Sequence, residues 1–185
     1  MKYLTAVLTG IVGLAIFSSS YADDGWQNRH VLTAEGVVRF VPDSISPQAL
    51  ADILFPTDDK PLTRSVWKNG EADSVSVAML IQFEFGSSNL TEKSKERLIA
   101  VGKMLKSDAA AGRKLVIEGH TDVIGPAEYN DRLSLARAES VKRHLALTHE
   151  IELERLEIVG KGENHLIDPG NPKGAINRRV QFKAS

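Results

Sequence analysis

The chain has 185 residues, of which 42% are hydrophobic and 25% are charged, and its formal net charge at pH 7 is −1. These values are typical of one globular domain with an additional segment, and they argue against a disordered chain, a membrane-embedded chain or a basic nucleic-acid-binding protein. The chain contains no cysteine, which excludes a lipid-modified cysteine, disulfide bonds, thiolate metal sites and cysteine nucleophiles.

Residues 1–22 have the features of a secretory signal peptide. A lone Lys2 precedes an apolar run from Leu4 to Phe17, and the small residue Ala22 closes the segment. This run is shorter than the ~20 residues needed to cross a bilayer, so an uncleaved anchor is the less favoured alternative. We therefore predict cleavage after Ala22 and an exported protein with no integral membrane segment in its mature form.

Residues 23–74 contain few long periodic segments, so we expect them to form an extended N-terminal arm. Four prolines interrupt the segment, at Pro42, Pro47, Pro56 and Pro61. Ser46 can cap a helix whose first residue is Pro47, which predicts a short helix near residues 47–55. The apolar edge of this helix is expected to dock on the domain that follows.

Clear periodicity begins at Val75 and predicts one domain over residues 75–185. Alternation predicts four strands, within residues 75–85, 113–120, 154–162 and 177–184, and helical spacing predicts helices over residues 92–107 and 129–147. Because helices separate the first three strands, we expect these strands to be parallel with right-handed crossovers, and the fourth to pair antiparallel.

The expected fold is an α+β two-layer sandwich, βαβαβ–β, with a mixed sheet of about four strands and helices on one face. Polar residues occupy alternate strand positions, including Gln82, Glu84, Glu118, Glu157, Gln181 and Lys183. We expect the sheet face that carries them to meet water.

Arg137 does not fit the amphipathic pattern of the second helix. It lies between Leu133 and Val141 in the apolar sector, on the same line as Asn130. An unpaired guanidinium at such a position is costly, so the fold or a ligand must supply an anion. Asp122, at the end of the preceding strand, is the nearest candidate in the sequence.

Asp122 and Arg137 are expected to line one cleft at the carboxyl edge of the parallel strands, where open α/β sheets tend to bind ligands. Two interpretations stay open. The pair is either a structural salt bridge between loop and helix, or an exposed anion and cation that match a zwitterion such as a free amino-acid head.

The segment IEGHTDVIGPAEYNDRLSLARAESVKRHL, with IQFEF before it and GKGENHLI and NRRVQF after it, resembles the OmpA-like C-terminal domain. The resemblance covers about Met79 to Lys183, and the motifs GHTD, YNxxLSxxRA and NRRV occur together in the order of that family. It implies a periplasmic domain that binds peptidoglycan without cleaving it, by holding the diaminopimelate residue of the stem peptide, and that needs no cofactor.

The resemblance implies that Asp122 and Arg137 are the main ligand contacts and that Asn130 and Arg178 support them. The residue pattern also favours Arg178 over Arg179, because Arg178 shares strand parity with the inward Val180 and Phe182. The alternative for Arg178 is a salt bridge at the sheet edge.

The chain departs from the pattern of the family at two positions. Gly86 stands where the first strand often ends in an acid, so we expect the adjacent Ser88 to contact the ligand weakly or not at all. Leu166 stands where a proline is usual, which predicts a different loop conformation. The family is usually attached to a barrel, a lipidated cysteine or a transmembrane helix, so the chain looks like a freestanding periplasmic member associated with the cell wall, at or near the outer membrane.

The sequence is compatible with two other functions. One is a metal-assisted cell-wall hydrolase that uses His120 and Asp122, but the five histidines form no recognisable ligand array and no serine nucleophile motif is present. We therefore expect a non-enzymatic protein without catalytic residues or a metal. The other, compatible with peptidoglycan binding, is an adaptor whose protein partner in the envelope docks on the arm around Leu50–Phe55.

Overall fold

The structure, a computed structural model, describes residues 30–33, 36–56, 67–68, 71–72, 75–84 and 86–185. The expected signal peptide over residues 1–22 lies outside these residues and stays a prediction. Within the described part of the chain, no helix is both long enough and apolar enough to span a membrane.

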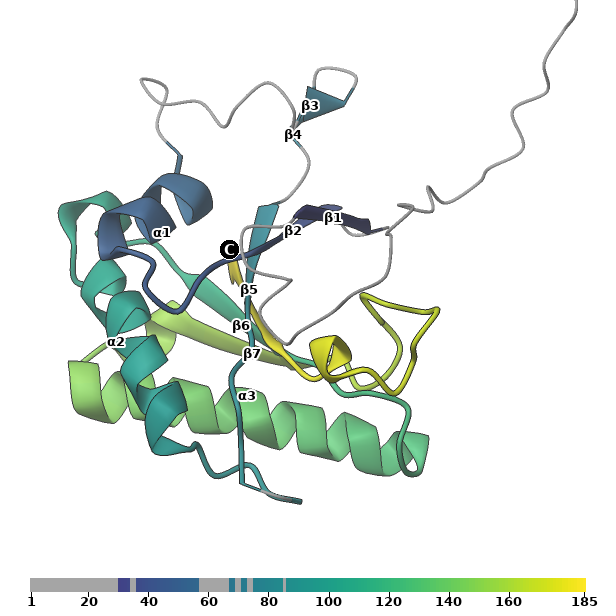
Figure 1. Cartoon of the computed structure of the whole chain (residues 1–185). Coiled ribbons are helices and arrows are strands. Elements are labelled where there is room, and N and C mark those ends of the chain that lie inside the picture. Colours follow the sequence, from purple (N-terminus) through teal and green to yellow (C-terminus); the bar gives the residue numbers. More distant parts are fainter. Residues whose placement is uncertain (1–29, 34–35, 57–66, 69–70, 73–74, 85) are drawn as a thin grey trace, which may run out of the picture.

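The described elements follow one another from a short hairpin to the C-terminal strand (Figure 1). In chain order they are β1 (His30–Thr33), β2 (Gly36–Phe40), α1 (Pro47–Leu54), β3 (Trp67–Lys68), β4 (Glu71–Ala72), β5 (Val75–Met79), α2 (Glu92–Leu105), η2 (Asp108–Ala110), β6 (Leu115–Gly119), α3 (Ala127–His149), η3 (Leu153–Arg155), β7 (Leu156–Gly160), η4 (Ala175–Asn177) and β8 (Val180–Ala184). The η elements are single 3₁₀ turns.

Among the described residues, the main sheet has six strands in the order β1-β2-β5-β8-β6-β7, and β3 and β4 form a separate two-stranded sheet. Strand β8 is antiparallel to both β5 and β6, and β6 is parallel to β7. This confirms the α+β fold with a mixed sheet, parallel β5, β6 and β7, and an antiparallel last strand. The expected number of four strands is wrong, because β1 and β2 extend the sheet beyond β5.

The additional strands come from the segment expected to be an arm. Strand β2 pairs in parallel with β5, with Val37 opposite Val75. Helix α1 has the expected N-cap, since the Ser46 hydroxyl accepts a hydrogen bond of 3.1 Å from the Ala49 amide. Strands β1 and β2 are therefore part of the main sheet and α1 is part of the core rather than of an extended arm, whereas β3 and β4 form a separate two-stranded sheet.

The apolar residues of α1 are interior, which removes the proposed docking edge of the adaptor hypothesis. Leu50, Ile53, Leu54 and Phe55 are all buried and belong to the main core cluster. Because these side chains pack against the chain's own domain, the segment Leu50–Phe55 presents no apolar edge to a partner. That part of the adaptor hypothesis is wrong.

The main core lies between the sheet and the helices α2 and α3 (Figure 1). Thr91 is the N-cap that precedes α2, and its hydroxyl accepts a hydrogen bond from the Ser94 amide. Helix α3 extends two residues beyond each end of the expected helix. Leu98, Ile117, Leu145 and Phe182 are fully buried at this interface. Burial of such side chains is the main driving force for this arrangement.

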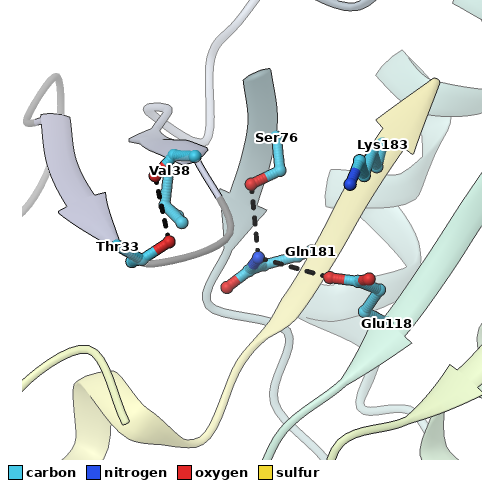
Figure 2. Close-up of a pocket in the computed structure, with 7 residues that line it drawn as sticks. Thr33, Val38, Ser76, Glu118, Gln181 and Lys183 are labelled. Atoms are coloured by element: carbon cyan, nitrogen blue, oxygen red, sulfur yellow. Dashed lines mark hydrogen bonds between the residues drawn. The ribbon is translucent and has the colours of Figure 1, made fainter. Parts of the chain in front are cut away.

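The other face of the sheet is less open to water than expected. Glu118 is 7% exposed and Gln181 is 3% exposed. Figure 2 shows the reason: Gln181 Nε2 donates to Ser76 Oγ at 3.2 Å and to Glu118 Oε2 at 3.5 Å, beside a small cavity that Thr33 and Val38 also line. The expectation of water on this face is wrong for these two residues. Residues of the β1–β2 hairpin line the same small cavity, and Glu118 and Gln181 are hydrogen-bonded to each other.

Candidate ligand-binding site at the start of α3

Strand β6 and helix α3 meet closely at Gly119, the last residue of β6 and the first of the GHTD motif. A Cβ atom on Gly119 would lie 2.1 Å from the backbone oxygen of Ser134, so only glycine fits there. This contact fixes the distance between the end of β6 and the helix. Arg137 lies on α3 three residues, or about one helical turn, after this contact at Ser134.

Asp122 is buried, with 5% of the residue exposed. Its Oδ1 accepts from the Ile124 amide at 3.0 Å, and its Oδ2 accepts from Arg178 Nη1 at 2.6 Å. The direct ionic partner of Asp122 is therefore Arg178 and not Arg137. The salt bridge expected between Asp122 and Arg137 is therefore wrong. Arg178 lies 56 residues from Asp122 in the chain, so local sequence spacing could not indicate it as the partner.

Arg178 reaches Asp122 from the turn before β8 rather than from the strand. It is the C-cap of η4, and β8 begins at Val180. The strand-parity argument therefore does not apply at Arg178, whose guanidinium instead pairs with Asp122. Arg179 is 3% exposed and donates from Nη2 to the His165 carbonyl at 3.0 Å, so it is part of the interior.

Arg137 is half-buried and has a different set of contacts. Its Nε donates to the Ser87 carbonyl at 3.4 Å, and its Cζ lies 4.9 Å from the centroid of the Phe83 ring. Among the described residues, no carboxylate forms an ion pair with it and neither Nη atom donates a hydrogen bond. Burial lowers the pKa of Arg137, and the nearby charge of Asp122 opposes this shift.

Asn130 is 1% exposed and braces the loop. Its Nδ2 lies 3.1 Å from the Asp122 carbonyl, 3.2 Å from the Ile124 carbonyl and 2.6 Å from Glu163 Oε2. An amide nitrogen has only two hydrogens, so these three acceptors occupy its donors. Asn130 thus positions the backbone of the loop, together with Glu163, which sequence reasoning missed because nothing in the local pattern distinguishes it.

The segment after β5 contributes through its backbone and a ring. The expected strand over residues 75–85 ends at Met79, and Phe83 forms an isolated bridge with Leu90. Ser88 is half-buried, and within the described residues its side chain makes no hydrogen bond. The structure therefore brings the Ser87 carbonyl and the Phe83 ring to Arg137 instead of the Ser88 hydroxyl.

His120, the metal ligand of the hydrolase hypothesis, lies in the interior at 1% exposure. Its Nε2 is 3.9 Å from Glu118 Oε2, and burial lowers the pKa of His120 to about 4, against the opposing effect of Glu118. Among the residues that the structure describes, no group of three or more histidine and carboxylate side chains has the arrangement of a metal site. The environment of His120 is that of a neutral buried imidazole.

The lowered pKa of His120 predicts a loss of stability in mild acid. Between its ordinary value of 6.5 and the folded value of about 4, the unfolded chain binds a proton that the folded chain does not. This contribution is complete above pH 6.5 and is lost as the pH falls toward 4. We expect His120 to lower the free energy of unfolding by roughly 2 kcal/mol between pH 7 and pH 5, measured by urea denaturation. His120→Gln should lose this difference, and a pH dependence of unchanged size in that variant would contradict the assignment.

The comparisons with known proteins agree with this architecture. Residues 82–179 match the OmpA family, which is more than half of the chain. The outer membrane protein Omp38 of Acinetobacter baumannii is 30% identical over 161 residues, covering 86% of this chain and 44% of that protein. The peptidoglycan-associated lipoprotein of Pseudomonas aeruginosa is 37% identical over 103 residues, covering 55% of this chain and 59% of that protein. The chain thus matches less than two thirds of the length of each of these relatives.

A solved structure shows the same fold at lower sequence identity. The OmpA-like domain of FopA1 from Francisella tularensis superimposes with a TM-score of 0.50 and 17% identity. The match covers 68% of this chain and 96% of that domain.

Proposed function

Because the chain belongs to the OmpA family, we propose that it binds peptidoglycan non-covalently, through the diaminopimelate residue of the stem peptide, and so links the protein to the cell wall in the periplasm. The relative named peptidoglycan-associated lipoprotein supports the general ligand. The relative named outer membrane protein Omp38 supports an envelope location. No covalent step is part of this function.

The observation that carries the proposal is the half-buried guanidinium of Arg137 beside the ion pair of Asp122 and Arg178. Arg137 is half-buried, and this burial lowers its pKa. Its described contacts include a carbonyl and a ring but no carboxylate. One anion and two cations therefore lie close together, and a ligand carboxylate would compensate the surplus positive charge.

A diaminopimelate side chain ends in a carboxylate and an ammonium on one carbon, and this head fits the proposed site. The Nη edge of Arg137 can donate two parallel hydrogen bonds to the carboxylate. Asp122 Oδ2, already paired with Arg178 at 2.6 Å, can accept a further bond from the ammonium, because an ionised carboxylate has several acceptor sites. Arg178 and Asn130 keep Asp122 in place.

The proposal predicts that the mature protein sediments with purified diaminopimelate-type sacculi. Asp122→Ala should remain in the supernatant, because it removes the anion for the ammonium and leaves Arg178 unpaired. The matched control is Asp131→Ala, at an exposed position of α3, which should sediment like the wild type. Pelleting of a folded Asp122→Ala variant would contradict the site.

The same assay separates binding from the hydrolase alternative. Binding predicts that the supernatant contains no soluble muropeptides after incubation with the wild type. Steady release of muropeptides, measured by chromatography, would show cleavage and would favour the enzyme.

A further inference from the structure

We infer that Phe83 is a positioning residue for Arg137: the face of its ring fixes the plane of the guanidinium and thereby the direction from which a carboxylate can bind. This inference rests on the proposed function and adds to it a residue that the ligand itself need not touch.

The first support is the geometry of the two side chains. The Arg137 Cζ lies 4.9 Å from the centroid of the Phe83 ring, within the distance at which a cation is attracted to an aromatic face. A planar guanidinium can stack on such a face, and stacking leaves its N–H bonds free to point outward in the plane. Attraction of this kind is stronger where water is partly removed, as it is around the half-buried Arg137.

The second support is that Phe83 is itself held. Its backbone forms an antiparallel bridge with Leu90, and the Glu84 amide donates to the Asn89 carbonyl at 2.9 Å. The Phe83 side chain packs against the main core cluster. Because the backbone bridge and the core contact hold the ring in place, we expect the guanidinium to take its orientation from the ring.

The third support is the use of the guanidinium donors. The Ser87 carbonyl, four residues after Phe83 in the chain, accepts the Nε hydrogen at 3.4 Å. Among described residues, the Nη atoms have no acceptor. With one face on the ring and Nε bound to Ser87, the Nη edge is the side left for a carboxylate. Ordering this edge before the ligand arrives reduces the entropy lost on binding.

The chain contains a second pair of the same kind that serves as a control. The Arg113 Cζ lies 5.9 Å from the Phe55 ring centroid. Phe55 is buried in the core beside α1, and Arg113 is exposed before β6. Truncating Phe55 therefore removes a core aromatic ring and the ring contact of Arg113, without changing the surroundings of Arg137.

The test is calorimetric titration of the mature chain with an uncross-linked muropeptide that contains diaminopimelate. Phe83→Leu keeps apolar volume but removes the aromatic face, and we expect it to weaken binding roughly 3- to 30-fold. Phe83→Tyr retains the face and should restore affinity to within about twofold of the wild type. Phe55→Leu should also bind within about twofold, even where its melting temperature falls.

The outcomes distinguish this inference from the proposed function. Wild-type affinity in Phe83→Leu, together with loss of binding in Arg137→Ala, would overturn the inference and leave the function intact. Equal weakening in the Leu and Tyr variants would also overturn it, since the ring face would then not matter. Wild-type affinity in both Phe83→Leu and Arg137→Ala would overturn the proposed function itself. In an Arg137→Lys background, Phe83→Leu should cause a smaller loss than in the wild type, because the two residues act on the same contact.

Discussion

Arg137→Ala is expected to reduce the affinity for a diaminopimelate muropeptide by at least about 30-fold, since truncating one partner of a buried charge pair costs about 2–5 kcal/mol. Arg137 supplies the charge and the two donors that we assign to the ligand carboxylate. Its own contacts, a carbonyl at 3.4 Å and a ring at 4.9 Å, stabilise its orientation rather than neutralise its charge. Calorimetric titration measures the change.

Two variants on the same helix define what the Arg137→Ala result means. Arg143→Ala removes an exposed arginine that pairs with Glu139 at 3.4 Å, and it should bind like the wild type. Arg137→Lys keeps the charge but lacks the planar fork, so its affinity should lie between those of the wild type and Arg137→Ala. Wild-type affinity in an Arg137→Ala protein whose circular dichroism is unchanged would contradict the assignment.

Gly119→Ala is expected to lower the free energy of unfolding by about 3 kcal/mol. A Cβ at this position would lie 2.1 Å from the Ser134 backbone oxygen and 2.9 Å from its carbonyl carbon. Helix α3 must move away from β6 to accommodate it, and both elements belong to the main core. Chemical denaturation measures the loss, and the midpoint should fall without a large change in slope.

A second glycine provides the control for Gly119→Ala. At Gly170, an added Cβ would lie 3.4 Å from Asp168 Oδ1, which is an ordinary contact. Gly170→Ala should therefore change the free energy of unfolding by less than about 0.5 kcal/mol. A Gly119→Ala variant as stable as this control would show that α3 does not approach β6 as closely as the structure has it.

The secondary structure that the sequence predicted well is the part that depends on local chemistry. Ser46 is the N-cap of α1 and Thr91 is the N-cap of α2. The direction of the strands followed from the helical crossovers between them. The position of β8 between β5 and β6 did not, because alternation along a strand reports which face is buried and says nothing about its neighbours.

The sheet face that carries polar residues shows a second limit of sequence reasoning. Glu118 and Gln181 alternate with apolar residues and were expected to meet water. In the fold they bond to each other, and Gln181 also bonds to Ser76, 105 residues away in the chain. Polarity predicts exposure only where no distant partner satisfies the group, and such a partner lies outside the window in which a pattern is read.

The sequence singled out Arg137 and Asp122 but did not indicate their contacts. Arg137 could be identified because a cation interrupts an apolar helix face, and Asp122 because it follows a strand end. The bond from Asp122 to Arg178 joins residues 56 positions apart, and the ring of Phe83 lies on another segment again. Local spacing fixes which side chains share a face, whereas the tertiary fold decides which of them meet.

The central claim is that Arg137 and Asp122 bind the zwitterionic head of diaminopimelate. Its most direct test is calorimetric titration of the wild-type chain with two uncross-linked muropeptides that differ only in whether the third residue is diaminopimelate or lysine. Lysine keeps the ammonium and lacks the carboxylate, so Arg137 would have no anion to bind. We predict measurable binding of the diaminopimelate muropeptide and affinity at least about 30-fold weaker for the lysine muropeptide. Equal affinity for the two muropeptides would contradict the claim.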